Sequence, residues 1–176
     1  MIGPNNIHNI KGFITIEQSK DLIEFIDKQE WDDKSLSRRV QHYGYRYDYK
    51  SRNLEKTNPI PEEFSFILKD LNECFTVPIS SCIVNEYRPG IDGISPHIDD
   101  PKKFSDTIAS LSLLSPCLMK FTKDDEAYEY FLAPNSMIII TGEGRYKWKH
   151  EISKNKTFIY NDVKYERERR VSVTFR

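Results

Sequence analysis

The sequence predicts an α+β protein that is mainly β, a jelly roll with two support helices near its N-terminus. Two observations carry this prediction. Before about residue 80, apolar side chains recur twice at helical spacing, whereas the later apolar segments are short and separated by turn-forming residues. A series of short strands with turns between them is typical of sandwiches and barrels. The chain of 176 residues has the size of one domain, so we expect a single domain over residues 1–176.

The first predicted helix begins after Thr15. Gln18 follows Thr15 at the spacing of a capping box, in which each side chain satisfies a backbone N–H at the start of the helix. Leu22, Ile23 and Ile26 then recur on one helical face. These features predict a helix over residues 16 to 29.

The second predicted helix begins near Pro61, because proline suits the first helical position. Glu62 and Glu63 follow in the first turn, where the helix dipole favours acidic side chains. The apolar stripe of this helix consists of Phe64, Ile67, Leu68, Leu71 and Phe75. We interpret this stripe as core and not as part of a cofactor site.

Strands are expected from residue 80 onward. Their predicted ranges are Ser81–Tyr87, Ile94–Asp99, Thr107–Leu114, Leu118–Thr122, Glu129–Leu132, Met137–Thr141, Lys147–Ile152 and Arg169–Phe175. The clearest turns are Pro89-Gly90, Pro134-Asn135 and Gly142-Glu143-Gly144. The polar stretch 154–168 is expected to be a loop or a hairpin before the last strand.

The last predicted strand carries two arginines on one face. Arg170, Ser172, Thr174 and Arg176 alternate with Val171, Val173 and Phe175. The Cα atoms of the two arginines would lie roughly 20 Å apart at the usual rise of a strand. Guanidinium groups bind carboxylates bidentately, so this face could hold the two ends of a small dicarboxylate. Taken alone, however, the pattern is that of an ordinary edge strand with solvated arginines.

A candidate metal site starts from His97 and Asp99. On an extended strand these two side chains point the same way, and His150, 53 residues later, would arrive from another strand. Two histidines and one carboxylate are the ligand set of the non-haem iron facial triad. The His-x-Asp spacing alone is a weak signal, and Asp99-Asp100-Pro101 also has the composition of a solvated turn.

Together these segments resemble the AlkB family of Fe(II)- and 2-oxoglutarate-dependent dioxygenases. The resemblance covers about residue 36 to the C-terminus and rests on segments 85–90, 97–99, 108–113, His150 and 170–176, in the family's order. It implies the double-stranded β-helix form of the jelly roll, and Fe(II), 2-oxoglutarate and O2 as cofactors. The implied iron ligands are His97, Asp99 and His150, and the implied contacts of 2-oxoglutarate are Asn85, Tyr87, Arg170, Ser172 and Arg176. Ser172 stands where the bacterial type member has an asparagine.

Segments 38–45 and 141–150 most resemble the oxygenase module of the AlkB homologue that acts on the modified wobble uridine of tRNA. Between residues 37 and 52, five Lys and Arg side chains stand against Asp48 alone, a local charge of +4, and four tyrosines are interleaved with them. Cations suit phosphates and aromatic rings suit unstacked bases, so we predict a nucleic-acid partner, RNA or tRNA. The candidate substrate contacts are Arg38, Arg39, Tyr43, Tyr45 and Trp148. The alternative is a β-hairpin whose tyrosines pack on the core, and Trp148 fits core packing equally well.

The remaining composition narrows the class of protein. The net charge is −1, so any case for nucleic acid must be local. Apolar runs of transmembrane length and a signal peptide are both lacking, so we expect no membrane partner and an intracellular, cytoplasmic monomer. Cys74, Cys82 and Cys117 have no metal-like spacing and are expected to be reduced core thiols. Two alternative functions stay open, a hydroxylase or demethylase of protein side chains and a catalytically silent jelly-roll binding module.

Overall fold

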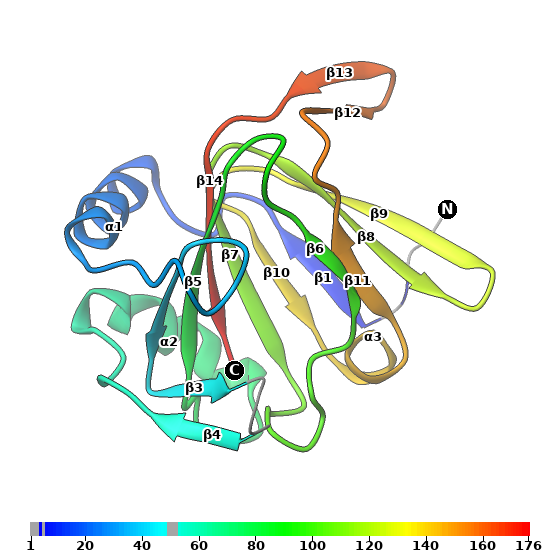
Figure 1. The fold of residues 1–176 in the computed structure, drawn as a ribbon. Coiled ribbons are helices and arrows are strands. Elements are labelled where there is room, and N and C mark those ends of the chain that lie inside the picture. The colour runs from blue at the N-terminus through cyan, green and yellow to red at the C-terminus, as the bar shows by residue number, and fades with distance from the viewer. Residues whose placement is uncertain (1–3, 5, 49–52) are drawn as a thin grey trace.

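Two antiparallel sheets face each other in the computed structural model, which describes residues 4, 6–48 and 53–176 (Figure 1). In order, the large sheet consists of β1 (Ile7–Ile10), β10 (Met137–Ile140), β7 (Ile108–Leu114), β14 (Arg170–Phe175), β5 (Cys82–Tyr87) and β2 (Val40–Tyr43). The small sheet consists of β6 (Ile94–His97), β11 (Lys149–Ile152), β8 (Cys117–Lys123) and β9 (Glu126–Leu132). The predicted jelly roll is therefore confirmed.

Two helical segments cover the outer face of the large sheet, as predicted (Figure 1). Helix α1 (Ile16–Lys28) begins with the expected capping box of Thr15 and Gln18. After Pro61, a 3-10 turn (Glu62–Phe64) leads into α2 (Ser65–Leu71) and a second 3-10 turn (Asn72–Cys74). The apolar stripes of both segments pack on the outward side chains of the sheet and form the first part of the core.

The strands of the large sheet separate apolar from polar side chains because successive residues point to opposite faces. On β14, Val171, Val173 and Phe175 are buried in the cluster beneath the helices. Arg170, Ser172 and Thr174 therefore face the small sheet. The space between the sheets holds a second apolar cluster, and the polar side chains of β14 line a cavity beside it. Both faces of this strand are thus used, one for stability and one for a site.

Three predictions need correction or completion. The segment predicted as a Gly142-Glu143-Gly144 turn is the start of a short helix, α3 (Gly142–Tyr146). A Cβ on Gly144 would lie 2.6 Å from Cγ1 of Ile7, so the missing side chain lets β1 pack against this helix. Strand β1 was not predicted because it is short and lacks alternation. Cys82 and Cys117 are buried, but Cys74 is exposed and is not a core thiol.

Two small hairpins extend from the sheets. The first consists of β3 (Tyr45–Asp48) and β4 (Asn53–Lys56), so part of the tyrosine-rich stretch forms a hairpin, although Tyr45 on it is exposed and does not pack on the core. The second consists of β12 (Thr157–Tyr160) and β13 (Val163–Glu166), within the polar stretch 154–168. Within the described part of the chain, no helix combines the length and apolar character that crossing a bilayer requires.

Candidate metal centre

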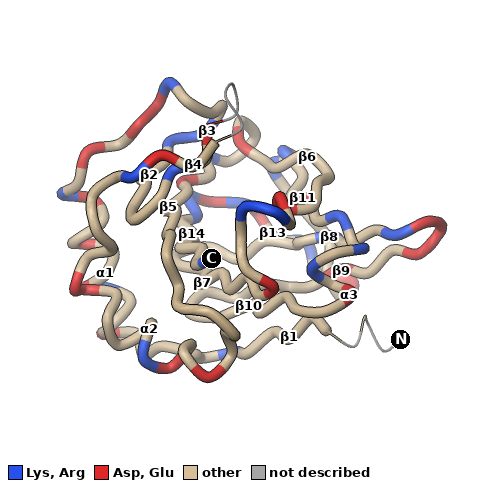
Figure 2. The backbone as a smooth tube through the Cα atoms, turned by 90° about the horizontal axis from the view of Figure 1, so that it is seen from below, with Lys and Arg blue, Asp and Glu red and all other residues tan. Residues whose placement is uncertain are grey.

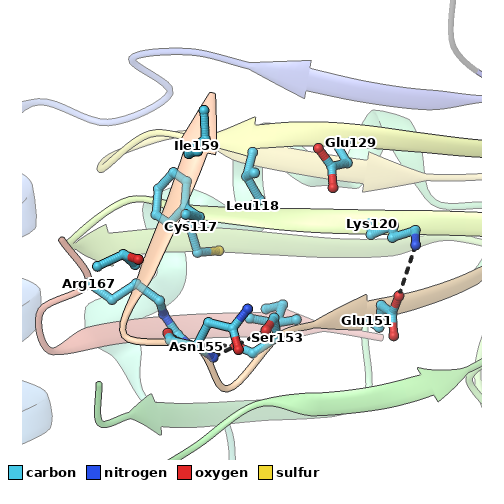
Figure 3. Close-up of a pocket in the computed structure, with 12 residues that line it drawn as sticks. Cys117, Leu118, Lys120, Glu129, Glu151, Ser153, Asn155, Ile159 and Arg167 are labelled. Atoms are coloured by element: carbon cyan, nitrogen blue, oxygen red, sulfur yellow. Dashed lines mark hydrogen bonds and ion pairs between the residues drawn. The ribbon is translucent and has the colours of Figure 1, made fainter. Parts of the chain in front are cut away.

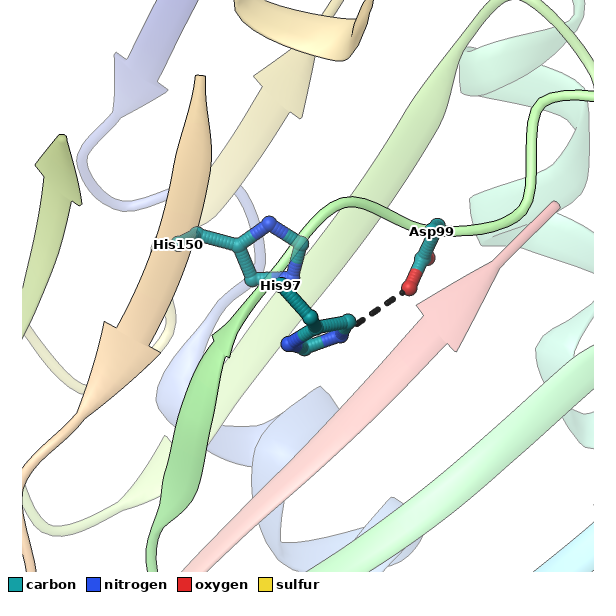
Figure 4. Close-up of side chains that lie close together, drawn as sticks. All are labelled: His97, Asp99 and His150. Atoms are coloured by element: carbon teal, nitrogen blue, oxygen red, sulfur yellow. Dashed lines mark hydrogen bonds and ion pairs between the residues drawn. The ribbon is translucent and has the colours of Figure 1, made fainter. Parts of the chain in front are cut away.

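His97, Asp99 and His150 meet between the two sheets (Figure 4). His97 ends β6 and pairs directly with His150 on the neighbouring β11, and Asp99 follows two residues after β6. One potential ligand atom from each side chain lies within 4.8 Å of the other two. Strand pairing thus brings together two histidines that are far apart in the sequence. Two imidazoles and one carboxylate converge as in a facial triad.

The ring of His97 is oriented by a backbone carbonyl. Its Nδ1 lies 2.9 Å from the carbonyl oxygen of Ser95, and its Nε2 lies 3.2 Å from Oδ1 of Asp99. When Nδ1 carries the proton, it donates to Ser95 and leaves the lone pair of Nε2 directed at the centre of the triad. Metal-binding histidines are commonly fixed in this way through their second ring nitrogen.

The charge states of the triad suit a metal ion. Burial alone would raise the pKa of Asp99, but the nearby Arg176, the hydrogen bond to His97 and both imidazoles outweigh it and hold this pKa well below its usual range. Burial lowers the pKa of His150 to about 4. The carboxylate is therefore anionic and His150 is neutral at neutral pH, which are the forms that bind metals.

A polar cavity adjoins the triad. Its lining includes Arg38, Asn85, Tyr87, Ser110, Arg170, Ser172, Thr174 and Arg176 together with the three triad residues. Strand β14 pairs with β7 on one side and with β5 on the other, so it is a central strand. The alternative of an edge strand with solvated arginines is therefore wrong, and Arg170 and Arg176 point into the interior.

Arg170 is buried, and its guanidinium group is only partly hydrogen-bonded within the described structure. Its side chain is 1% exposed, and Nη2 donates to Oγ of Ser112 at 2.7 Å, whereas Nε and Nη1 have no hydrogen-bond partner among the residues that the structure describes. The guanidinium carbon lies 5.0 Å from the ring centre of Tyr87. A buried cation with unsatisfied N–H groups is costly unless an anion completes it. The end of the cavity at Arg170 therefore fits a carboxylate, and the donor set of the triad fits iron.

Asn85 and Tyr87 lie on β5 opposite Ser172 and Arg170, and both face the same cavity. Arg38, which the sequence suggested as a substrate contact, also reaches into it. Nε of Arg38 donates to Oδ1 of Asn85 at 2.8 Å, and its guanidinium carbon lies 5.6 Å from the ring centre of Tyr87. Arg38 is thus positioned beside the candidate cosubstrate contacts.

Three other candidate substrate contacts do not lie at the cavity. Arg39 is turned to the opposite face, where it donates to Glu86 at 2.6 and 2.8 Å and lies over Trp31. Tyr43 is 8% exposed and packs in the core beneath the helices. Trp148 is 4% exposed and packs edge-on against Tyr128. The predictions that Tyr43 and Trp148 contact substrate are corrected, because buried rings cannot stack on a base.

Phe104 connects the β3–β4 hairpin with Arg176, which lies beside the triad. The sequence pattern did not single out this residue. The ring of Phe104 lies 4.3 Å from the guanidinium carbon of Arg176 and 6.0 Å from the ring centre of Tyr47. Tyr45 on the same hairpin is 39% exposed and stays available to a partner. Tyr49, Lys50 and Arg52, which contributed to the predicted aromatic and basic stretch, lie outside the described residues.

Charge along the backbone is mixed and not of one sign (Figure 2). The predicted local excess of cations is also partly neutralised. Arg39 pairs with Glu86, and Arg46 lies 2.7 Å from Glu55 across the β3–β4 hairpin. Any electrostatic attraction of a polyanion therefore depends on a small number of side chains.

Residues 10–176 match the family model of the 2OG-Fe(II) oxygenase superfamily. The chain is 34% identical to an "Alkylated DNA repair protein ALKBH8 homolog" from Arabidopsis thaliana, over 93% of its own length and 56% of the relative's. It is 36% identical to the "tRNA (carboxymethyluridine(34)-5-O)-methyltransferase ALKBH8" of Macaca fascicularis, over 85% of its own length and 24% of the relative's.

Its fold is similar to the structure of OsALKBH1, with a TM-score of 0.78 at 20% identity, over 100% of this chain and 98% of the other. The chain spans about half of the Arabidopsis relative and a quarter of the macaque relative. The sequence matches therefore show the oxygenase superfamily and the structural match shows the fold, while the longer relatives contain further segments.

Proposed function

The chain belongs to the 2OG-Fe(II) oxygenase superfamily, and from this membership we propose that it hydroxylates or oxidatively demethylates a nucleic-acid substrate, namely RNA such as tRNA. As a dioxygenase of this superfamily it depends on Fe(II), 2-oxoglutarate and O2. The observation that carries the proposal is the convergence of His97, Asp99 and His150 beside the buried, incompletely paired Arg170.

In this proposal, the iron ligands are Nε2 of His97, a carboxylate oxygen of Asp99 and a ring nitrogen of His150. These three residues would hold the iron and would leave other positions open for the cosubstrate and for O2. Arg176 lies 3.1 Å from Oδ2 of Asp99 and holds that carboxylate in its anionic form. It thereby keeps one oxygen of Asp99 oriented toward the two histidines.

The cosubstrate contacts in this proposal lie on β5 and β14. Arg170 offers Nε and Nη1 to one carboxylate of 2-oxoglutarate, with Asn85, Tyr87 and Ser172 around it. Arg176 follows the other end of the strand, beside the triad, and would bind the second carboxylate. A guanidinium suits this task because its donors match the two oxygens of a carboxylate.

When bound, iron and 2-oxoglutarate supply the activation of O2 and the hydroxylation of a substrate C–H bond. The protein binds and orients them and excludes water by the apolar cluster that borders the cavity. A hydroxylated N-methyl group breaks down to formaldehyde, which amounts to demethylation, whereas a hydroxylated carbon side chain remains an alcohol. The triad is compatible with both outcomes.

The choice of RNA rests on three features. The relatives include a protein whose printed name describes tRNA modification, and segments 38–45 and 141–150 resemble that branch of the family. The β3–β4 hairpin contacts the site through Phe104 and carries the exposed Tyr45. An enzyme that modifies a base must take it out of its stack, and an exposed aromatic ring near the site can hold such a base.

The test is mass spectrometry of nucleosides from tRNA that has been incubated with the protein, Fe(II) and 2-oxoglutarate. A new hydroxylated or demethylated nucleoside, with matching succinate release, is the expected result. Succinate release without a change in any nucleoside would favour the protein-substrate alternative. A folded protein that binds 2-oxoglutarate but never releases succinate would favour the catalytically silent binding module.

A further inference from the structure

A single buried arginine clamps the loop that follows the metal-site strand. Arg145 on α3 donates from Nη1 to the carbonyl oxygen of Asp99 at 2.7 Å. It also donates from Nη2 to the carbonyl of Asp100 at 3.3 Å and from Nε to the carbonyl of Ser105 at 3.1 Å. All three acceptors belong to one loop, and one of them is the backbone of a candidate iron ligand.

Arg145 also links two elements of the candidate metal centre. Helix α3 leads directly into β11, which carries His150, while the clamped loop carries Asp99. Strand pairing does not position Asp99, because Asp99 lies beyond the end of β6. It does not position Arg145 either, because Arg145 lies on helix α3. The clamp therefore supplies the positional constraint that the sheet does not give to the carboxylate.

Burying this guanidinium is costly, which indicates a role beyond packing. Arg145 is 2% exposed, and among the described residues its hydrogen-bond partners are backbone carbonyls. Burial lowers the pKa of Arg145, and the negative charge of Asp99 opposes that effect. An apolar side chain of similar size would fill the same space but would leave these three loop carbonyls without the guanidinium as donor, so the arginine serves to hold the loop and not only to pack.

We propose that Arg145 is a positioning residue of the metal centre, which fixes the backbone of Asp99 so that its carboxylate meets His97 and His150. This inference rests on the proposed function, because it assumes that the triad binds iron. Arg145 itself contacts neither the metal nor the cosubstrate in this scheme. Its loss therefore weakens metal binding through the loop, as loss of residues that support metal ligands commonly does.

The chain offers a matched control in Arg167, which lies at a separate pocket beside Ser153 and Asn155 (Figure 3). Arg167 is 7% exposed, and it too donates to three backbone carbonyls, those of Ser153, Asn155 and Asp92. None of these acceptors belongs to the triad. The two arginines therefore have the same kind of bonding and differ in what they hold.

The experiment compares Arg145→Met and Arg145→Lys with Arg167→Met in the full chain. Binding of Mn²⁺, an octahedral and redox-stable substitute for Fe(II), is measured by calorimetric titration with 2-oxoglutarate present, and melting is measured in parallel. Arg145→Met is expected to weaken Mn²⁺ binding by about 10- to 100-fold. Arg145→Lys should weaken it less, because an ammonium can still reach one carbonyl. Arg167→Met should lower the melting temperature and leave Mn²⁺ affinity unchanged.

Wild-type Mn²⁺ affinity in folded Arg145→Met overturns the proposal, and so does an equal loss of affinity in Arg167→Met. If Arg145→Met does not fold, Arg145→Lys decides between the two outcomes. If neither variant folds, Arg145 is a structural residue and the proposal fails. Absence of Mn²⁺ binding by the wild-type chain would contradict the proposed metal centre itself, which keeps the two failures distinct.

Discussion

His97 and His150 are direct partners across the antiparallel strands β6 and β11, and their ring centres lie 4.3 Å apart. Cross-strand neighbours on one face of a sheet always lie close together. The pairing register of these strands therefore determines the distance between the two imidazoles. A one-residue shift would turn one ring to the other face, so the metal site depends on this register.

The first prediction concerns the metal ligands. His97→Ala, Asp99→Ala and His150→Ala should each abolish succinate formation and strongly weaken Mn²⁺ binding, because a three-ligand facial site cannot lose one ligand and keep its geometry. Circular dichroism should show a folded protein in each case. His8→Ala is the matched control, because His8 is an exposed histidine on β1 and should leave turnover unchanged. Full activity in Asp99→Ala would refute the assignment.

The second prediction concerns Arg170. Arg170→Met should weaken 2-oxoglutarate binding at least about tenfold, because hydrogen bonds to a charged partner contribute roughly 1.5–3 kcal/mol. Without 2-oxoglutarate, the same variant should melt no lower than the wild type, because Nε and Nη1 of the buried guanidinium are unpaired within the described part of the chain. Calorimetric titration and thermal melting with and without 2-oxoglutarate check both parts.

The neighbouring Arg169 is the control for that experiment. It lies on the opposite face of the sheet, where it forms ion pairs with Asp27 and with Glu86. Arg169→Met should therefore lower the melting temperature and leave 2-oxoglutarate affinity unchanged. The assignment of Arg170 would be contradicted if the two variants showed the opposite pattern, or if 2-oxoglutarate bound Arg170→Met as tightly as it binds the wild type.

The third prediction concerns pH. Burial, with smaller contributions from nearby arginines, lowers the pKa of His42 to about 4. Below about pH 6.5 the imidazole of His42 therefore binds a proton more readily in the unfolded chain than in the folded one. The free energy of unfolding should be highest above this pH and should fall as the pH is lowered toward 4. Relative to a neutral His42→Gln variant, the wild type should lose up to roughly 2 kcal/mol between pH 7 and pH 5. Denaturant unfolding at the two pH values measures this difference, and equal losses in both proteins would contradict it.

The sequence predicted much of the fold because its signals are local. The capping box of Thr15 and Gln18 and the alternation along residues 170–176 need only neighbouring residues to be interpreted, and the structure contains both features. The alternation also placed Arg170 and Arg176 on one face. It did not show that β14 lies at the centre of the large sheet, because pairing partners are distant in sequence.

The failures have the same physical origin. Tyr43 and Trp148 were candidate substrate contacts because they are aromatic and lie in segments 38–45 and 141–150, but a local pattern does not reveal which side chains meet the core. The contact of Phe104 with Arg176 and the proposed positioning role of Arg145 were not predicted, because both involve residues far along the chain, and the sequence marks Arg145 only as a basic side chain near His150. Signals of that kind are absent from local sequence patterns.

The fourth prediction concerns the proposed RNA contact. Tyr45→Ala should weaken RNA binding by about 1–3 kcal/mol if its exposed ring stacks on a base, and should leave 2-oxoglutarate turnover in the absence of RNA unchanged. The affinity of the wild type should fall as salt rises, because cations on phosphates release counterions. Fluorescence anisotropy with labelled tRNA at several salt concentrations measures both effects.

Tyr43→Ala provides the contrast, because the two tyrosines are close in sequence but differ in burial. Tyr43 packs edge-on against Phe64 in the core, so its loss should lower the melting temperature by the cost of a core cavity. At a temperature where both variants are folded, only Tyr45→Ala should lose RNA affinity. RNA binding that is indifferent both to salt and to Tyr45→Ala would remove the support for an RNA contact at this hairpin, and the protein-substrate alternative would then be preferred.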